Sequence, residues 1–300
     1  HQKLETKLAE WLDREIVLIY PSGFQANLAA VLALSDRHTP VICDRLIHHS
    51  LLVGVKASGA KLFRFKHNNL SELEKLLKKS RQNNPRKQPL VITESLFSME
   101  GTTAPIKEIS KLCIEYDSKL LIDEAHAFGV MGSAGRGESF ELKEPISIIS
   151  GTFGKAFGSG GAFLATDKIT GKNLIQNCGA FRYTTALAPP LCASALAALN
   201  LIESNPNWGS ELKEKSKALR DRLSQVGWQR PAGEGPIISI ILGSDRLAMD
   251  YQERLEAQGL LTVAIRPPTV PEGKSRLRLV IRRNTPDQAF ERLIEVLKNK

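Results

Sequence analysis

Cysteine is scarce in this chain, and its cysteines lie too far apart to suggest a metal site or a redox pair. The four are Cys43, Cys113, Cys178 and Cys192, and none forms a Cys-x-x-Cys pair. We therefore expect reduced, mostly buried thiols in a cytoplasmic protein, with no disulfide framework. A single catalytic cysteine is the alternative interpretation.

Long apolar runs are also missing. No run approaches 18 residues, so the sequence predicts no membrane-spanning helix. The opening residues, HQKLETKLAEWL, have the spacing of an amphipathic helix rather than of a signal peptide. The chain starts inside that helix without a methionine, and we expect the natural protein to begin earlier.

Charge of one sign is in excess, because the formal net charge is +9 over 300 residues. A basic balance can indicate a nucleic-acid partner. However, Lys and Arg are scattered, apart from KLLKKSRQNNPRK at 75–87, which is typical of a solvated helix end and loop. A generally basic surface, or attraction of a phosphorylated substrate, accounts better for the charge. We predict no nucleic-acid partner and no membrane partner.

Short apolar, β-rich runs alternate with helical patterns over the first part of the chain. The predicted strands are 40–44, 61–65, 89–94, 119–124, 146–151 and 161–166, and the clearest predicted helices are 23–35, 48–57, 70–80 and 105–117. This alternation predicts an α/β fold, with a mostly parallel sheet and helices on both faces. A short glycine-rich loop joins the last two strands, which predicts that the final strand runs antiparallel.

The pattern changes near residue 188. An Ala-rich helix with proline near its start is followed by a charged helix at 209–226. Further predicted elements are strands at 236–242, 261–265 and 275–281 and helices at 246–258 and 286–298. We expect a large domain over 1–203 and a smaller C-terminal α+β domain over 204–300.

Polar side chains follow several of the predicted parallel strands, at the edge where open α/β sheets bind ligands. They are Glu94, Ser98, Asp123, His126, Asp44, His48, His49, Thr152 and Lys155. Each has an ordinary explanation by itself, because an Asp that ends a buried strand is often a cap and a lone His is often structural. Convergence on one edge of the sheet indicates a ligand site.

The run DEAH at 123–126 could suggest a metal site or a helicase motif. Asp123 and His126 follow a strand rather than lying on a helix, and no third metal ligand is apparent. No GxxxxGK[ST] loop precedes the run. The sequence therefore predicts neither a metal ion nor a nucleoside triphosphate.

The stretch SGTFGKAFGSGGAF at 150–163 places Lys155 among small residues, which let its backbone pass close to a ligand. Pyridoxal phosphate needs a lysine for its aldehyde, a carboxylate for its ring nitrogen and backbone N–H groups for its phosphate. Lys155 and Asp123 would supply the first two. The Ser-Gly step of YPSGFQAN at 20–27 would open a helix for the third. We predict this cofactor, although a tight hairpin loop alone would also explain the glycines.

Five motifs together resemble the α-oxoamine synthases, a family of fold-type I pyridoxal-phosphate enzymes. They are SGFQAN, DRLIHHSLL, DEAHAFGVMGSAGRG, SGTFGKAFGSGGA and AIRPPTVPEGKSRLRL, and they span most of the chain in order. The resemblance implies a seven-stranded, mostly parallel sheet and a homodimer. It also implies a family segment of about eighty residues before the point that matches His1, with an asparagine and an arginine that contact substrate.

The resemblance also implies a role for each matching residue. Lys155 resembles the lysine that forms the Schiff base, Asp123 the aspartate at the ring nitrogen, and His48 the histidine stacked on the ring. His126 and Ser98 resemble the residues that hydrogen-bond the phenolic oxygen. The phosphate contacts would be Gly23, Phe24 and Thr152, with Thr184 or Thr185 reaching the phosphate of the partner subunit.

Two further residues would bind the substrate. Arg278 resembles the arginine that takes the amino-acid carboxylate, and Thr269 lies in the stretch AIRPPTVP. That stretch favours family members that condense L-alanine with a pimeloyl thioester of coenzyme A or acyl carrier protein, in biotin synthesis. Two alternatives remain: a sister enzyme of the glycine C-acetyltransferase, 5-aminolevulinate synthase or serine palmitoyltransferase type, or a non-catalytic relative.

Overall fold

The computed structural model describes residues 1–142 and 146–298. The chain forms two compact units, His1–Phe97 with Ala104–Pro206, and Ser98–Thr103 with Asn207–Lys300. The predicted boundary at 203 differs from this division, since the first unit ends at Pro206 and the segment 98–103 belongs to the second. That segment packs there because Ser239 Oγ donates to Met99 O over 2.6 Å.

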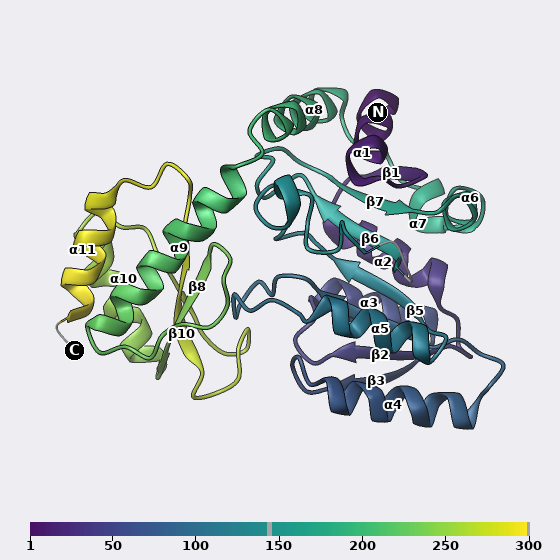
Figure 1. The fold of residues 1–300 in the computed structure, drawn as a ribbon, viewed down its shortest axis with the longest axis horizontal. Helices are drawn as coiled ribbons and strands as arrows, with labels where there is room; N and C mark the ends of the chain where they lie inside the picture. The colour runs from purple at the N-terminus through teal and green to yellow at the C-terminus, as the bar shows by residue number, and fades with distance from the viewer. Residues whose placement is uncertain (143–145, 299–300) are drawn as a thin grey trace. The chain divides into compact units, whose positions relative to one another are not determined.

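A seven-stranded sheet forms the centre of the first unit, with the strand order β1-β7-β6-β5-β4-β2-β3 (Figure 1). The strands are β1 Ile16–Tyr20, β2 Pro40–Asp44, β3 Lys61–Phe65, β4 Leu90–Glu94, β5 Lys119–Asp123, β6 Ile146–Thr152 and β7 Ala162–Thr166. Strands β2 to β6 are parallel, and β7 runs antiparallel to β6 and to β1. The predicted antiparallel strand is confirmed. Strand β1, absent from the six strands that the pattern predicted, completes the sheet.

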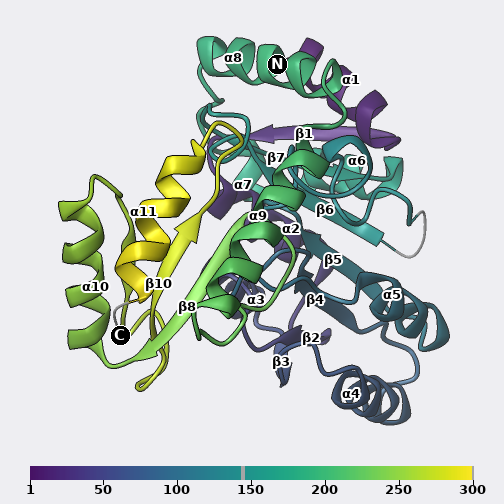
Figure 2. The ribbon, with the colours of Figure 1, turned by 60° about the vertical axis from the view of Figure 1, so that its left-hand side comes forward.

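Helices cover both faces of this sheet (Figure 2). On one face lie α2 Gly23–Leu34, α3 His49–Ser58 and α6 Lys168–Asn177; on the other lie α1 Gln2–Leu12, α4 Leu70–Asn83, α5 Ile106–Glu115 and α8 Pro189–Glu203. Successive side chains of a strand point to opposite faces, so a strand covered on both sides is apolar along most of its length. All five residues of β4 are buried, including the polar Thr93 and Glu94 at its carboxyl end.

Helix α2 packs closely and positions part of the site. It starts at Gly23 because Ser22 Oγ accepts the Gln25 N–H over 3.3 Å, which caps the helix. Its sequence, GFQANLAAVLAL, is nearly all apolar and rich in alanine, and it packs against α3. Asn27 is the one polar residue among the side chains that this helix buries.

The second unit contains a three-stranded antiparallel sheet with the order β8-β10-β9. Its elements are α9 Trp208–Gln225, β8 Ile237–Gly243, α10 Asp245–Ala257, β9 Val263–Ile265, β10 Ser275–Val280 and α11 Asp287–Lys298. Arg220 of α9 is fully buried and donates to Ile237 O over 2.8 Å, which ties the helix to β8. Desolvation lowers the pKa of Arg220 to about 10, so the group stays charged at neutral pH.

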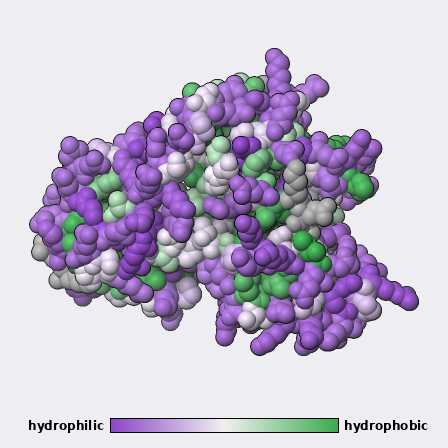
Figure 3. Space-filling model, in the orientation of Figure 1, coloured by the Kyte–Doolittle hydropathy of each residue, from purple (hydrophilic) through white to green (hydrophobic). Residues whose placement is uncertain are grey.

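Most of the surface shown in Figure 3 is hydrophilic, with hydrophobic side chains in small scattered groups. Within the described part of the chain, no helix combines the length and the apolar character needed to cross a membrane.

The four cysteines are buried and form no disulfide. Burial raises the pKa of Cys43 and of Cys113 to about 12, and it also raises the pKa of Cys192. A thiol acts as a nucleophile through its thiolate form, which burial disfavours. These environments argue against the catalytic-cysteine interpretation, while the cytoplasmic location stays a prediction.

Candidate active site

The carboxyl ends of β5 and β6 lie side by side and carry three of the predicted residues. Asp123 ends β5 and pairs with Ser150 of β6, and Thr152 and Lys155 follow Ser150 along the chain. Asp123 is buried, with Oδ1 accepting the Ala125 N–H over 2.9 Å and Oδ2 accepting Asn27 Nδ2 over 2.7 Å. The carboxylate is therefore held in one orientation at the edge of the sheet.

His48 caps α3 and is connected to Asp123 through two other side chains. Its Nδ1 lies 2.7 Å from Ser50 Oγ and accepts the Ser50 N–H over 3.3 Å. Ser50 Oγ in turn accepts from Asn27 Nδ2 over 3.0 Å, and the same Nδ2 donates to Asp123. The structure thus brings His48 and Asp123 into one hydrogen-bonded group.

Sequence reasoning missed Asn27 and Ser50, although both have polar side chains that are buried. Asn27 lies inside the otherwise apolar helix α2, where asparagine is an unfavourable residue unless its amide has partners. A polar residue at a position that the apolar pattern predicts to be buried was therefore the signal for Asn27 in the sequence. The partners themselves could not be inferred, because Asn27 and Asp123 are 96 positions apart.

The start of α2 lies next to Thr152 and suits an anion. A Cβ added to Gly23 would lie 3.8 Å from Thr152 Cβ, so the two residues are neighbours. The N–H groups of Gly23 and Phe24 belong to the first turn, which no carbonyl of the same helix can reach. A helix N-terminus also favours negative charge, so a phosphate would be stabilised here.

The loop that carries Lys155 is closed by its own backbone. Phe153 N–H donates to Gly161 O over 2.9 Å, and Ser159 N–H donates to Phe153 O over 2.8 Å. Gly161 has a φ of 91°, and a Cβ there would lie 2.5 Å from Leu187 Cδ2. Glycine is therefore required for the compact loop, as the hairpin interpretation expected, and the same loop presents an exposed Lys155.

Glu124, the second residue of DEAH, is fully buried and holds the loop that follows. Its Oε1 accepts the Ser139 N–H over 2.7 Å, and its Oε2 accepts Ser95 Oγ over 2.5 Å and the Glu138 N–H over 3.2 Å. Burial raises the pKa of Glu124, while these donors act in the opposite direction. In residues 1–142 and 146–298, no group of three or more His, Cys, Asp and Glu side chains could hold a metal ion.

Replacement of Glu124 by glutamine is expected to destabilise the protein. The amide nitrogen cannot accept hydrogen bonds, so at least one buried donor loses its partner, at a cost of about 1–3 kcal/mol. Urea unfolding measures the difference. Glu141→Gln, at an exposed position, is the control and should change the free energy of unfolding by less than about 0.5 kcal/mol. Equal stability of Glu124→Gln and the wild type would contradict this role.

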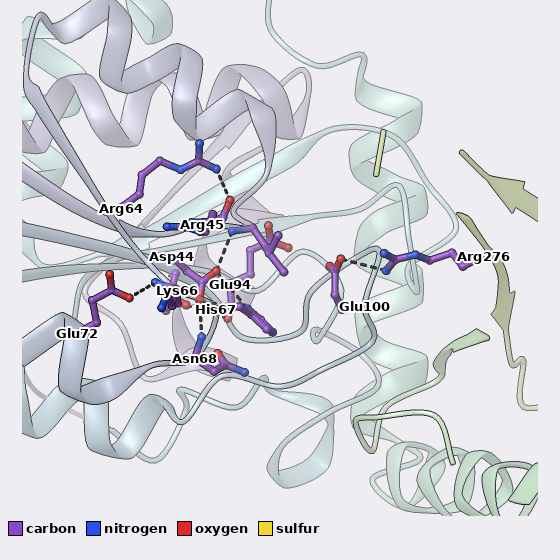
Figure 4. Close-up of polar contacts among 12 residues, drawn as sticks. Asp44, Arg45, Arg64, Lys66, His67, Asn68, Glu72, Glu94, Glu100 and Arg276 are labelled. Atoms are coloured by element: carbon purple, nitrogen blue, oxygen red, sulfur yellow. Dashed lines mark hydrogen bonds and ion pairs between the residues drawn. The ribbon is translucent and has the colours of Figure 1, made fainter. Parts of the chain in front are cut away.

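Asp44 lies at the same edge of the sheet but has local structural partners (Figure 4). It is fully buried and accepts the N–H groups of Leu46 and Asn68, each over 2.8 Å. His67 Nδ1 lies 3.1 Å from Asp44 Oδ1. Both carboxylate oxygens are therefore occupied by neighbouring backbone and side chains, and for this residue the structural interpretation holds.

Ser98 and Arg278 lie together in the second unit. Arg278 Nε donates to Ser98 O over 2.6 Å, and no described residue hydrogen-bonds the two terminal nitrogens of Arg278. Burial lowers the pKa of Arg278, but a guanidinium stays charged at neutral pH. Arg276 of the same strand is already paired with Glu100 over 3.1 Å (Figure 4). Of these two arginines, Arg278 is the one whose two terminal nitrogens could bind a carboxylate.

The other predicted residues lie in turns or on the surface. His126 is half-buried in the turn after β5, and His49 is exposed at the first position of α3. Thr184 is half-buried and Thr185 is exposed, in the segment after α7 Gly179–Arg182, and no described contact joins either to Asp123 or His48. Thr269 is exposed in a turn where its N–H donates to Arg266 O over 3.0 Å.

The first unit has features that fit pyridoxal phosphate. The carboxylate of Asp123, the N-terminus of α2 beside Thr152 and the exposed Lys155 all lie at the carboxyl-terminal side of the sheet. Two buried polar atoms close to Asp123 have no partner among the described residues. They are Oγ of Ser150, which pairs with Asp123 in the sheet, and Oδ1 of Asn27, whose amide nitrogen bonds Asp123. Unpaired buried polar atoms are rare in proteins and are expected where a bound group completes a site.

Comparison with known proteins agrees with these features. Residues 1–297 match the family model described as aminotransferase class I and II. The chain is 37% identical to the 8-amino-7-oxononanoate synthases of Chromohalobacter salexigens and Methylobacillus flagellatus, in each case over 99% of this chain, and it covers 77% and 74% of their lengths.

Solved structures show the same fold. The serine palmitoyltransferase of Sphingomonas wittichii superposes with a TM-score of 0.93 at 26% identity, covering 99% of this chain and 75% of that protein. The 8-amino-7-oxononanoate synthase of Francisella tularensis gives 0.84 at 28% identity, covering 99% and 85%. The predicted fold class, cofactor and enzyme class are thereby confirmed. The chain belongs to the class I and II aminotransferase family and is a pyridoxal-phosphate-dependent acyltransferase of the α-oxoamine synthase type.

Proposed function

We propose that this chain condenses L-alanine with a pimeloyl thioester, on coenzyme A or acyl carrier protein, to give 8-amino-7-oxononanoate for biotin synthesis. The observation that carries the proposal is the 37% identity to synthases of that name over nearly the whole chain. Lys155, Asp123 and His126 are all present, which supports a working enzyme over a non-catalytic relative.

Most of the residues that would hold the cofactor belong to the first unit, and Ser98 belongs to the second. We assign Lys155 to its aldehyde, Asp123 to its ring nitrogen and His126 to its phenolic oxygen, with Ser98 as a second contact to that oxygen. Gly23, Phe24 and Thr152 would hold the phosphate, and Thr184 or Thr185 would reach the phosphate in the partner subunit of a homodimer. When bound, pyridoxal phosphate supplies an electron sink for negative charge that forms at the α-carbon of the amino acid.

The chain's own residues would move protons and orient the substrate. The Lys155 amine takes the proton from the α-carbon of alanine and later returns a proton to that carbon. When the cofactor is bound, the Asp123 carboxylate would keep a proton on its ring nitrogen, and His48 would lie against the ring. Arg278 holds the substrate carboxylate, with Thr269 as a further substrate contact. Overall, a bond from the α-carbon to the acyl carbon replaces the carbon–sulfur bond, and the thiol and carbon dioxide leave.

Assays of the purified protein test the substrates. L-alanine, glycine and L-serine are each supplied with pimeloyl, acetyl, succinyl and palmitoyl thioesters, and the released thiol and the product mass are measured. Fastest turnover of alanine with the pimeloyl thioester is the expected result. Preference for serine with palmitoyl-coenzyme A would favour the second candidate, a serine palmitoyltransferase, which the TM-score of 0.93 supports. Bound cofactor without any thiol release would point to a non-catalytic relative.

Arg278→Lys is expected to weaken amino-acid binding. A lysine at this position cannot bond Ser98 O through Nε and also present a planar fork to a carboxylate. Loss of a charged hydrogen bond predicts a KM for alanine about 10- to 100-fold higher, with a smaller change in kcat. Steady-state kinetics check this, and Arg246→Lys, an exposed arginine of α10, is the matched control. An unchanged KM would remove Arg278 from the proposed site.

A further inference from the structure

Asn27 donates two hydrogen bonds from a buried position. Its side chain is 4% exposed, and Nδ2 lies 2.7 Å from Asp123 Oδ2 and 3.0 Å from Ser50 Oγ. An ionised carboxylate only accepts, so the amide nitrogen, not the amide oxygen, must face Asp123. Both hydrogens of the amide are therefore used, one toward Asp123 and one toward Ser50.

The direction of these bonds continues to His48. Ser50 is fully buried, and because its Oγ accepts from Asn27, its single hydrogen is left for His48 Nδ1, which is 2.7 Å away. The Ser50 N–H also points at Nδ1, over 3.3 Å. A ring nitrogen that faces two donors acts as an acceptor, so the proton of a neutral His48 belongs on Nε2.

We infer that Asn27 and Ser50 are positioning residues that hold His48 with its proton on Nε2 and fix the Asp123 carboxylate. The two sides of the cofactor site then form a single hydrogen-bonded unit. The inference rests on the proposed function, to which it adds two residues that orient His48. Held in this way, the exposed ring keeps one orientation and one proton position.

The unpaired oxygen of Asn27 favours this role over a purely structural one. Asn27 Oδ1 is buried and no described residue donates to it. A buried acceptor without a partner costs about 1–3 kcal/mol, and a leucine, similar in size, would avoid that cost in this apolar helix. The two donors of the asparagine, which act on Asp123 and, through Ser50, on His48, explain why an amide stands at this position.

Nitrogen-15 NMR of the histidine rings tests the inference on the full chain without cofactor or substrate. At a pH where the rings are neutral, His48 should carry its proton on Nε2, and Nδ1 should resonate as a hydrogen-bonded acceptor. The signal is assigned by its loss in His48→Gln. In Ser50→Ala, Nδ1 should move toward the position of a free ring nitrogen, and a form protonated at Nδ1 should appear.

Ser58→Ala is the matched control, because the Ser58 hydroxyl lies on the same helix and donates to Val55 O over 2.9 Å. It should leave the His48 signals unchanged. In the cofactor-loaded enzyme, Ser50→Ala should lower kcat about tenfold and leave the KM for alanine unchanged, since one oriented hydrogen bond is lost. If Ser50→Ala folds poorly, Asn27→Leu should move Nδ1 in the same direction by a smaller amount, because the Ser50 hydroxyl remains but no longer has the Asn27 donor that orients it.

A proton on Nδ1 of His48 in the wild type, or Nδ1 signals that neither variant moves, would overturn the inference. The proposed function fails separately, through the substrate assays, because the NMR measurement needs neither cofactor nor substrate.

Discussion

Lys155→Ala is expected to abolish both the absorbance of lysine-bound pyridoxal phosphate and the release of thiol from the acyl substrate. The amine is proposed both to bind the cofactor and to move the α-proton, and no other described lysine lies in this loop. Turnover should fall by about 10,000-fold or more, the range for loss of a central acid–base group. Absorbance of the purified protein and single-turnover thiol release are the two measurements.

The loop itself should survive this substitution. Its closing bonds, from Phe153 N–H to Gly161 O and from Ser159 N–H to Phe153 O, involve only backbone atoms. Lys168→Ala, at an exposed lysine in the first turn of α6, is the control and should keep both absorbance and turnover. Normal absorbance and product formation by Lys155→Ala would end the assignment of this residue.

The parallel core was predictable because its strands carry continuous apolar runs. Runs at 40–44, 89–94 and 119–124 correspond to β2, β4 and β5, which are covered on both faces. The antiparallel β7 was predictable from the short loop before it. Strand β1 is absent from the predicted strands; it directly follows α1 and pairs with β7, whose Thr166 lies opposite Ile16. Its sequence, IVLIY, is as apolar and β-rich as the predicted strands, so a local pattern was present, and only its pairing with β7 depends on distant sequence.

The site shows where sequence reasoning stops. Asp44 and Asp123 both end buried parallel strands, and no local pattern separates them. Asp44 bonds to Leu46, His67 and Asn68, whereas Asp123 receives an amide from α2, which is distant in sequence. Tertiary packing therefore decides that Asp44 is a structural cap and that Asp123 is the candidate catalytic carboxylate. The same reason explains why the segment 98–103 was not expected in the second unit.

Asp123→Asn is expected to retain the cofactor and to lose most of the activity. The lysine and the phosphate site remain, but a neutral amide no longer holds a proton on the ring nitrogen, so charge at the α-carbon is poorly stabilised. Loss of such a charge predicts a fall in kcat of about 100- to 1,000-fold. Absorbance titration with pyridoxal phosphate and steady-state kinetics measure the two effects, and near-normal rates would contradict the role of Asp123.

The substitution also has a structural cost, which a control can separate from the chemical one. In the wild type both oxygens of Asp123 accept, from Ala125 N–H and from Asn27, and an asparagine has only one oxygen. One buried donor is left unpaired, which costs about 1–3 kcal/mol of stability. Asp44→Asn loses acceptors in the same way at a strand end with local partners, so it should lose similar stability while the activity of the folded protein stays near normal. An equal loss of activity in both variants would mean that any disturbance of the carboxyl edge of the sheet stops turnover. The charge of Asp123 would then not be the cause of the lost activity.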